Sequence, residues 1–391
     1  MPEKVDIWRS LVSQLIPNMT EEQSDRTECI DDAKAFASTN DASNVAPTSG
    51  EYLTSRWQHQ LDTPLLSISR SLMACEFEVL LNRGQYSAAG DAAIEALDTV
   101  EHLEAKFSVY RPQSELSLLN RMAAKRPIPV SVDTFLLLRL AQVIHQQTAG
   151  AFDMTAGSLS EAWGFARRSA QMPDEESIRR ALEVVGSGYI ELCEGNRTVS
   201  IVREGVKLNP GGIGKGFAVD QASDRLLRAG VRDFLLHGGL SSITGFGQRS
   251  RSGVICPKTG LDASAGWLIA LKHPWRIEEQ IGSICLRNQA LATSGSGKQF
   301  FHYQGKRYSH IIDPRTGWPA QGLMSATVIH RSAAVADALA TAIFVMGYEA
   351  AIAFCECHAS IGCILVYEHP ETGRQMIEVR NLSDETFRPL R

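Results

Sequence analysis

The sequence predicts an α+β fold. Short apolar runs typical of strands and longer amphipathic segments typical of helices follow one another, but without the regular β–α–β repeat of a nucleotide-binding parallel sheet. No G-x-G-x-x-G fingerprint is found, and the glycine loop at 211–216 departs from the Walker A pattern. With 391 residues, 44% of them hydrophobic and 21% charged, the chain suits one large or two medium globular domains.

The first 66 residues are expected to form an extension that carries no chemistry. Residues 1–66 combine acidic, polar and small residues and show only short periodic pieces, which predicts a poorly ordered or helical segment. The folded body is expected at 67–391. It opens with an apolar strand at 77–81 and a helix at 90–107, in which four apolar residues keep the helical period: Ala93, Leu97, Val100 and Leu103.

The middle of the chain predicts further alternation of helices and strands. Asp174 is a suitable N-cap for the third predicted helix. In order, the predicted elements are helices at 135–148 and 175–185, a strand at 198–202, a helix at 216–229, and strands at 233–236, 267–272 and 282–287.

The last helices carry the first candidate site. Apolar residues recur at helical spacing between Ser332, a good N-cap, and Gly347, a good C-terminal glycine. A further helix at 348–357 and a strand at 362–367 follow. Asp337 and Thr341 are four residues apart, so both project from one face of an otherwise apolar helix, where an unpartnered carboxylate is costly to bury.

Two kinds of partner would satisfy Asp337. A hard cation such as Mg²⁺ binds few protein oxygens and completes its octahedron with phosphates and water. Alternatively, Asp337 pairs with a lysine or caps a neighbouring loop, and Thr341 bonds back to a carbonyl. The spacing by itself favours this structural alternative.

The charge and cysteine patterns exclude several classes of protein. A net charge of −5 without a dense Lys/Arg stripe does not predict a nucleic-acid partner. The eight cysteines are scattered, with Cys355 and Cys357 closest, which predicts reduced thiols in the cytoplasm. We expect neither a signal peptide nor a transmembrane segment, because charges interrupt the first thirty residues and no apolar run reaches about 18 residues.

Two glycine-rich segments are candidate anion sites. The first runs from Asn209 to Asp220 and opens a helix after a strand, where free amides and the helix dipole favour a phosphate. Tight packing of a strand against a helix would equally require these glycines. The second, at 293–297, predicts a turn with hydroxyls and amides, and His310 lies a strand's length beyond it. An ordinary hairpin and a structural histidine are the alternatives there.

Taken in order, these segments resemble the ApbE family of FAD:protein FMN transferases, from about Met73 to Tyr367. The resemblance rests on six blocks: residues 108–120 (SVYRPQSELSLLN), 150–157 (GAFDMTAG), 209–220 (NPGGIGKGFAVD), 292–295 (ATSG), 309–317 (SHIIDPRTG) and 336–341 (ADALAT).

The resemblance implies an α+β fold built from duplicated modules related to the tunnelling fold, with FAD in a cleft between them and Mg²⁺ at its pyrophosphate. It implies that Asp337 and Thr341 are side-chain ligands of the metal, and that Gly214 and Ala340 contribute through the backbone. The implied FAD-binding residues are Met73, Val109, Tyr110, Arg111, Gly150, Ala151, Phe152, Asp153, Gly211, Lys215, Phe217 and Ile312.

The implied reaction is attack of a threonine or serine hydroxyl of an acceptor flavoprotein subunit on the FMN phosphorus, with release of AMP. Metal and positioning would supply most of the rate. Removal of the proton of the hydroxyl needs a general base, and His310 is the residue expected to act as that base. Asp313 is the second candidate, either as base or as the group that orients the imidazole. FAD hydrolysis to FMN and AMP, and non-catalytic flavin binding or assembly, are the alternative functions.

The sequence departs from the family pattern at two places. The common Met-Gly-Thr of the first strand is Met73-Ala74-Cys75, and the usual Asn-x-Gly-Gly is Leu236-His237-Gly238-Gly239. We interpret His237 as a substitution rather than a second polar group of the cleft. Many relatives are exported lipoproteins, whereas no lipobox is seen here.

Overall fold

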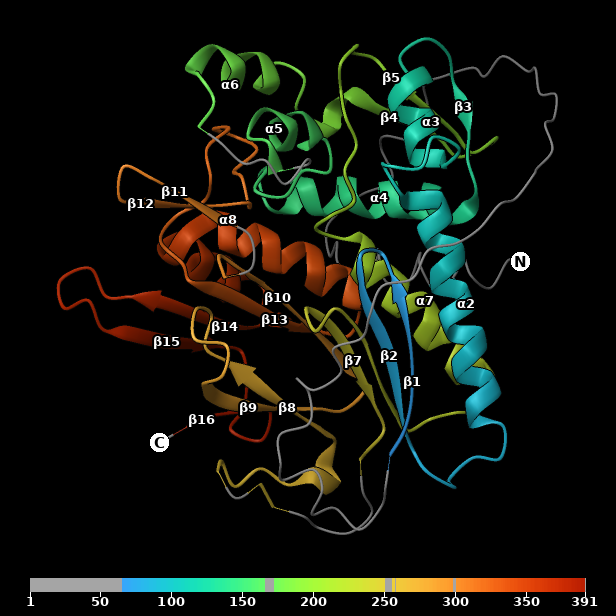
Figure 1. Ribbon diagram of the computed structural model, residues 1–391, viewed down its shortest axis with the longest axis vertical. Coiled ribbons are helices and arrows are strands. Elements are labelled where there is room, and N and C mark those ends of the chain that lie inside the picture. The colour runs from blue at the N-terminus through green and yellow to red at the C-terminus, as the bar shows by residue number, and fades with distance from the viewer. Residues whose placement is uncertain (1–64, 166–171, 250–254, 257, 298–299, 391) are drawn as a thin grey trace.

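The computed structural model describes residues 65–165, 172–249, 255–256, 258–297 and 300–390. The predicted extension at 1–66 therefore lies outside the described residues, apart from Leu65 and Leu66, which begin the first strand. Helices and one large antiparallel sheet form the body of the protein, as expected for an α+β fold (Figure 1).

The large sheet has eight strands, each antiparallel to its neighbours. Their order across the sheet follows their order in the chain: β1 (Leu65–Leu72), β2 (Cys75–Asn82), β6 (Phe234–Gly238), β7 (Ser242–Phe246), β10 (Gln289–Gly295), β13 (Ser325–His330), β14 (Gly362–Glu368) and β15 (Gln375–Arg380).

The two halves of this sheet repeat one pattern. In the first half, β1 and β2 are separated from β6 and β7 by a long helical stretch that ends in α7 (Gly214–Arg228). In the second half, β10 and β13 are separated from β14 and β15 by α8 (Ala333–Cys357). This arrangement of two strands, helix and two strands matches the expected duplication.

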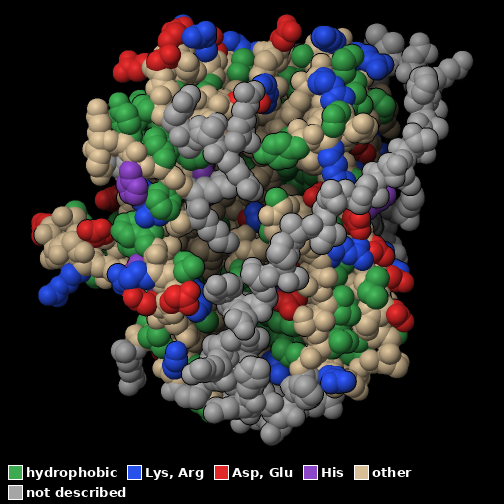
Figure 2. All heavy atoms as spheres, in the orientation of Figure 1, with side chains coloured by type: hydrophobic (Ala, Val, Ile, Leu, Met, Phe, Trp, Pro, Cys, Tyr) green, Lys and Arg blue, Asp and Glu red, His purple; other side chains and the backbone are tan. Residues whose placement is uncertain are grey.

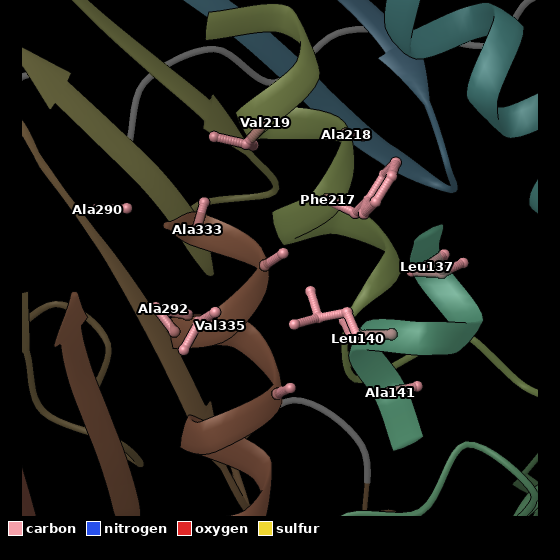
Figure 3. Close-up of a cluster of buried hydrophobic side chains, with 14 of the residues drawn as sticks. Leu137, Leu140, Ala141, Phe217, Ala218, Val219, Ala290, Ala292, Ala333 and Val335 are labelled. Atoms are coloured by element: carbon pink, nitrogen blue, oxygen red, sulfur yellow. The ribbon is translucent and has the colours of Figure 1, made fainter. Parts of the chain in front are cut away.

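The main hydrophobic core lies between the sheet and its helices. α2 (Ala89–Phe107) packs on α7, α7 packs on α8, and α8 lies on β10 and β13. α4 (Val132–Gln147) covers the junction of α7 and α8, and Figure 3 shows Leu140 of α4 directed toward it. Many core residues at this junction are small, including Ala218, Ala292 and Ala333, which allows the helices to lie close together.

A small sheet covers the opposite face of the large one. Its strands are β8 (Trp267–Lys272), β9 (Gln280–Leu286) and β16 (Phe387–Pro389). Trp267, Ile284 and Phe387 pack there against Leu235 and Ile364 of the large sheet in a second core. The large sheet is thus apolar on both faces.

Most of the remaining elements lie around the helical layer, whereas the turn at Ala263–Ala265 lies beside β8 (Figure 1). They are α3 (Glu115–Met122), β3 (Ile128–Pro129), α5 (Gly157–Ala162), α6 (Glu175–Leu182), β4 (Ile190–Cys193), β5 (Thr198–Ile201), β11 (Phe300–Tyr303), β12 (Lys306–Ser309) and two short 3₁₀ turns, Ser187–Tyr189 and Ala263–Ala265. β3, β4 and β5 form a small sheet, and β11 pairs with β12. On the face shown in Figure 2, basic and acidic side chains are interspersed.

The helix that carries Asp337 agrees closely with its prediction. Ser332 is its N-cap, and its side chain accepts a hydrogen bond from the backbone N–H of Val335. The continuous span Ala333–Cys357 is broken at Gly347, whose φ of 76° and ψ of −176° are not helical. The structure therefore contains the two predicted helices, 332–347 and 348–357, placed end to end.

α8 is also, among the residues that the structure describes, a helix long and apolar enough to cross a membrane, although the sequence analysis expected no such segment. Half of its most apolar window, 50%, is buried inside the protein. Packing against β10 and β13 accounts for this composition.

One local prediction was wrong. Thr293, Ser294 and Gly295 lie in β10 and pair with β13, so the segment 293–297 does not begin as a turn. Glycine is depleted in strands and serine often occurs in turns, and here the pairing of these residues with β13 decides the conformation.

The hairpin between β1 and β2 contains a strained alanine. Met73 and Ala74 occupy its two turn positions with φ values of 50° and 59°, a region that favours glycine. Ala74 is exposed. We expect Ala74→Gly to raise the free energy of unfolding by about 1 kcal/mol in denaturant titrations, because it relieves a left-handed alanine.

Ala229→Gly provides the control for this prediction. Ala229 is also exposed, but its φ is −76°. The same substitution there is expected to lower stability by a few tenths of a kcal/mol, since only the unfolded chain gains freedom. Equal effects at the two positions would contradict the strain at Ala74.

Candidate active site

The N-terminal turns of α7 and α8 interlock. The backbone N–H of Gly216 in α7 donates a hydrogen bond of 3.0 Å to Oδ2 of Asp337 in α8. A Cβ at Gly216 would lie 2.2 Å from the carbonyl oxygen of Ala333, so this position requires glycine. Gly216 therefore serves close packing, as one alternative expected, but the packing is between the two helices α7 and α8 rather than between a strand and a helix.

Asp220 makes the reciprocal contact from α7 to α8. Its carboxylate accepts hydrogen bonds from Ser332 Oγ at 2.6 Å, from the N–H of Ala333 at 2.7 Å and from the N–H of Ala334 at 3.0 Å. The pKa of Asp220 is raised to about 6, because burial and, to a smaller extent, the nearby Asp337 carboxylate raise it more than these hydrogen bonds lower it. The carboxylates of Asp220 and Asp337 thus lie close together where the first turns of α7 and α8 meet.

Asp337 itself is buried and incompletely compensated. Its exposed fraction is 5%, and besides Gly216 its Oδ2 lies 3.9 Å from Nζ of Lys215. The structural alternative is therefore partly realised, because Asp337 caps a neighbouring helix and has a lysine nearby. That separation is long for an ion pair, so the charge of Asp337 remains open to a second cation.

Thr341 places a hydroxyl beside this carboxylate. Its Oγ1 donates to the carbonyl of Asp337 at 3.3 Å, the back-bond expected in the structural alternative, and lies 3.1 Å from Oγ of Ser294 in β10. Gly214 is the first residue of α7, and Ala340 is buried within α8. The side-chain donors are thus hard oxygens, the kind that Mg²⁺ prefers.

The described residues contain no group of three or more His, Cys, Asp and Glu side chains arranged around a metal position. A cation beside Asp337 would therefore rely on one carboxylate, one hydroxyl, backbone carbonyls and a substrate. Mg²⁺ commonly binds in this way, with few protein ligands and several oxygens from water and phosphate. The residues present fit Mg²⁺.

The glycine loop before α7 joins three segments. A Cβ at Gly212 would lie 3.1 Å from Oγ1 of Thr341 and 3.3 Å from Cε2 of Phe152. Asn209 turns the loop, since its Oδ1 accepts from the N–H of Gly211 at 3.0 Å. The loop with Gly211, the 149–153 loop and α8 are therefore in direct contact.

The side chain of Asp153 holds the 149–153 loop in place through several hydrogen bonds. Gly150 has a φ of 77°, and Ala151 and Phe152 are buried. Asp153 accepts hydrogen bonds from His145 and from the N–H and hydroxyl groups of Thr155 and Ser187, at 2.7–3.1 Å. Its side chain is thus committed to the loop, and a ligand would meet this segment through its backbone.

The half-buried His145 and the buried Asp153 form a pair that makes stability depend on pH. The hydrogen bond to Asp153 raises the pKa of His145. Burial alone raises the pKa of Asp153, but the hydrogen bonds from His145 and Thr155 outweigh it, so this pKa lies below its usual value. The stabilisation from His145 is complete below its unfolded pKa of about 6.5 and is lost as pH rises through the folded value; that from Asp153 is lost at acid pH.

We therefore expect the free energy of unfolding to fall as pH rises above about 6.5. Denaturant titrations between pH 6 and 9 would measure this slope, which should disappear in His145→Gln. His102→Gln is the control, because His102 is exposed on α2. A slope that persists in His145→Gln would contradict the assignment.

Two of the residues predicted to bind FAD, Met73 and Arg111, are held by the same side chain, that of Glu104. The N–H of Met73 donates to Oε1 of Glu104 at 3.0 Å, and Nη2 of Arg111 lies 3.2 Å from Oε2 of the same side chain. Tyr110 is 76% exposed, so its ring is open to a ligand, and Val109 is half-buried. Glu104 of α2 thus connects the hairpin with the 108–111 segment.

His310 follows β12 at the edge of an aromatic cluster. Its ring lies 6.4 Å from that of Phe165, at an interplanar angle of 71°. Trp163, Phe301 and Tyr308 stack behind them. Ile312 is buried and pairs with Pro319 in an isolated bridge. The histidine is therefore presented by a well-packed segment.

Asp313 is committed to Arg315. Both carboxylate oxygens accept from the guanidinium group, Oδ1 from Nε and Oδ2 from Nη2, each at 2.9 Å. The side chain of Arg315 also contacts the 149–153 loop, since a Cβ at Gly150 would lie 3.6 Å from Cγ of Arg315. The His310 segment is thereby placed beside the residues predicted to bind FAD.

Phe217, which was predicted to bind FAD, and His237, which was interpreted as a substitution, both lie in packed surroundings. Phe217 is fully buried and packs edge-on against Phe107 at 5.6 Å, so its ring belongs to the core (Figure 3). His237 lies on the face of the sheet that bears the small sheet, and its Nε2 is 2.9 Å from Oε2 of Glu78. His237 therefore forms a pair across β2 and β6.

Three contributors to the site received no role from the sequence: Asp220, Glu104 and Arg315. The position of Asp220 could have indicated its role, because it lies four residues after Gly216 and so faces the same neighbour as the glycine.

Two cavities, of about 250 Å³ beside Asn120 and about 510 Å³ beside His102, lie outside the cluster of Asp337, Thr341 and Gly212.

Comparisons with known proteins agree with this arrangement. The model of the ApbE family matches residues 73–365. A protein of Haemophilus influenzae named FAD:protein FMN transferase is 30% identical over 307 residues, covering 76% of this chain and 85% of the relative. A protein of the same name from Vibrio cholerae is 32% identical over 262 residues, covering 66% of this chain and 74% of the relative.

Solved structures give the same result. The ApbE protein of Thermotoga maritima superposes with a TM-score of 0.70 at 28% identity, covering 81% of this chain and 97% of that one. The flavin transferase ApbE of Vibrio cholerae superposes with a TM-score of 0.69 at 26% identity, covering 83% and 98%.

Proposed function

The chain belongs to the ApbE family and is a transferase, and from this we propose that it moves the FMN part of FAD to a threonine or serine hydroxyl of an acceptor protein, releasing AMP. The structural observation that supports the proposal is the meeting of four separate segments. The 149–153 loop, the 209–216 loop, β10 and α8 converge at Thr341 and Asp337.

We assign the ends of FAD to two parts of this cluster. The N-terminus of α7 carries the positive end of the helix dipole, and Lys215 lies in its first turn, so the pyrophosphate is expected there. Met73, Tyr110 and Arg111 lie on a surface anchored by Glu104 and would contact the ring systems. Gly150 to Asp153 and Ile312 would contribute through backbone and apolar surface.

Asp337 and Thr341 would hold Mg²⁺, with the carbonyls of Gly214 and Ala340. When bound, Mg²⁺ would neutralise the charge of the pyrophosphate and favour departure of the AMP phosphate. The partial compensation of Asp337 by Gly216 and Lys215 supports this assignment. Lys215 would then be free to turn from Asp337 to the phosphate.

The acceptor hydroxyl would attack the phosphorus of the FMN part. A new oxygen–phosphorus bond forms, the bond from that phosphorus to the bridging oxygen breaks, and AMP leaves with the bridging oxygen. His310 would take the proton of the hydroxyl, since a neutral imidazole is a suitable base near pH 7. Asp313 is the weaker candidate, because Arg315 occupies both of its oxygens.

Incubation with FAD, Mg²⁺ and an acceptor protein tests the proposal. We expect AMP and covalently bound FMN in equal amounts, and neither product with excess chelator. AMP released at the same rate without acceptor would favour hydrolysis of FAD. Tight FAD binding with no AMP, even with metal and acceptor, would instead indicate an assembly protein.

A further inference from the structure

We propose that Asp220 is a positioning residue that fixes Asp337 and Thr341 at the metal position by clamping the N-terminus of α8 to α7. The inference rests on the proposed metal site. It concerns a residue that touches neither metal nor substrate and acts through α8.

The clamp consists of two reciprocal contacts between equivalent helices of the two halves. Asp220 of α7 accepts from Ser332 Oγ, Ala333 N–H and Ala334 N–H at the start of α8, at 2.6–3.0 Å. Asp337 of α8 accepts from Gly216 N–H at the start of α7, at 3.0 Å. Figure 3 shows Ala333 beside the first turns of α7. Each helix thus gives a carboxylate to the other's positive end.

The two carboxylates differ in how completely they are satisfied. Asp220 has three donors directed at it, two of them backbone N–H groups that α8 leaves unpaired at its first turn. Within the described part of the chain, Asp337 has one hydrogen-bond donor, the N–H of Gly216, and Nζ of Lys215 lies 3.9 Å away. Asp220 is therefore suited to hold the helix, and Asp337 retains the capacity to bind a cation.

The clamp leaves little room for α8 to move. Ala333 lies so close to α7 that a Cβ at Gly216 would approach its carbonyl oxygen to 2.2 Å. Asp337 is four residues beyond Ala333, one turn into the helix, and Thr341 follows a turn later. Loss of the Asp220 contacts would therefore release the turn that carries the metal ligands.

The substitution Asp220→Asn tests the clamp with little change of volume. The amide keeps one acceptor oxygen, but its NH₂ group would face N–H donors. We expect the Kd for Mg²⁺ to rise about 10- to 100-fold, the effect typical of losing a group that orients a metal ligand. The affinity for FAD without metal should change less than about threefold, because its contacts lie largely on other segments.

The Kd for Mg²⁺ would be measured by calorimetric titration of the FAD-loaded protein without acceptor. Asp224→Asn is the matched control: it removes the same charge from the same helix, but at an exposed pair with Arg228. Its Kd for Mg²⁺ should equal that of the unchanged protein. If removal of charge by itself explains the effect, Asp224→Asn will weaken binding as much as Asp220→Asn, and the clamp is overturned.

Ser332→Ala is a milder second variant, which decides the question if Asp220→Asn does not fold. It removes one donor to Asp220, and we expect a rise of about three- to tenfold in the same Kd. Unchanged Mg²⁺ affinity in either folded variant, together with its loss in Asp337→Ala, would overturn the clamp. Unchanged affinity in Asp337→Ala as well would overturn the metal site itself, and the clamp with it.

Discussion

Replacing Asp337 with alanine is expected to lower FMN transfer at least about 100-fold, equivalent to about 2.7 kcal/mol in the activation barrier. Asp337 is the one carboxylate among the proposed metal ligands, so its loss removes the charge that would hold Mg²⁺ at the pyrophosphate. The measurement is the rate of AMP release with acceptor present. The Tm should change little, because one hydrogen bond from Gly216 is lost together with a buried charge.

Asp337→Asn separates the catalytic role from the structural one. Its amide oxygen can still accept from Gly216 N–H, but it carries no charge for the metal. We expect transfer as low as in Asp337→Ala. Recovery of activity in Asp337→Asn, or global unfolding of Asp337→Ala, would show that Asp337 serves mainly to cap α7.

Replacing His310 with alanine is expected to lower transfer by roughly 10²- to 10⁴-fold, the usual range for loss of a general base. The affinity for FAD should be nearly unchanged, since His310 would act on the acceptor hydroxyl. The rate constant at saturating FAD is the informative measurement. Raising the pH should partly restore the rate of the variant, because hydroxide then replaces the base.

His302→Ala is the matched control for His310. His302 is exposed on β11 of the same hairpin, where it contacts Phe300. We expect its rate to match that of the unchanged protein. Asp313→Asn tests the competing base: a greater loss there than in His310→Ala would transfer the role to Asp313 and contradict the assignment.

Local patterns in the sequence were sufficient for much of the fold. The apolar spacing between Ser332 and Gly347 predicted α8, and the glycine predicted the break that the structure has at φ 76°. Helical spacing also predicted α2 and α4 to within a few residues. These elements are long, and their apolar faces match one period throughout, so local and tertiary preferences agree.

The contacts between segments could not be predicted in this way. The donors to Asp220 lie more than a hundred residues along the chain, and nothing local marks them. The commitment of Asp153 to Ser187, and the burial of Phe217 under α2, likewise arise from packing of distant segments. The turn predicted at 293–297 was wrong for the same reason, because residues 293–295 pair with β13, about thirty residues further along the chain.

The site residues were found through the resemblance, and the structure adds a physical reason for several of them. Gly216 is required by the approach of Ala333, whereas at Gly212 a Cβ would fit tightly against the side chains of Thr341 and Phe152. The structure also explains the glycine that the family pattern has at the position of Ala74. The backbone φ of 59° there favours glycine, without any need for contact with the flavin. These observations distinguish glycines that shape the site from residues that would touch FAD.

The central claim is that this chain attaches FMN covalently to another protein at the Asp337 site. Its most direct test is the intact mass of an acceptor protein after incubation with FAD and Mg²⁺, for the unchanged protein and for Asp337→Ala in parallel. With the unchanged protein, we predict an acceptor whose mass is increased by one FMN attached through its phosphate. With Asp337→Ala, we predict unmodified acceptor. Unmodified acceptor in both, or equal modification in both, would contradict the account.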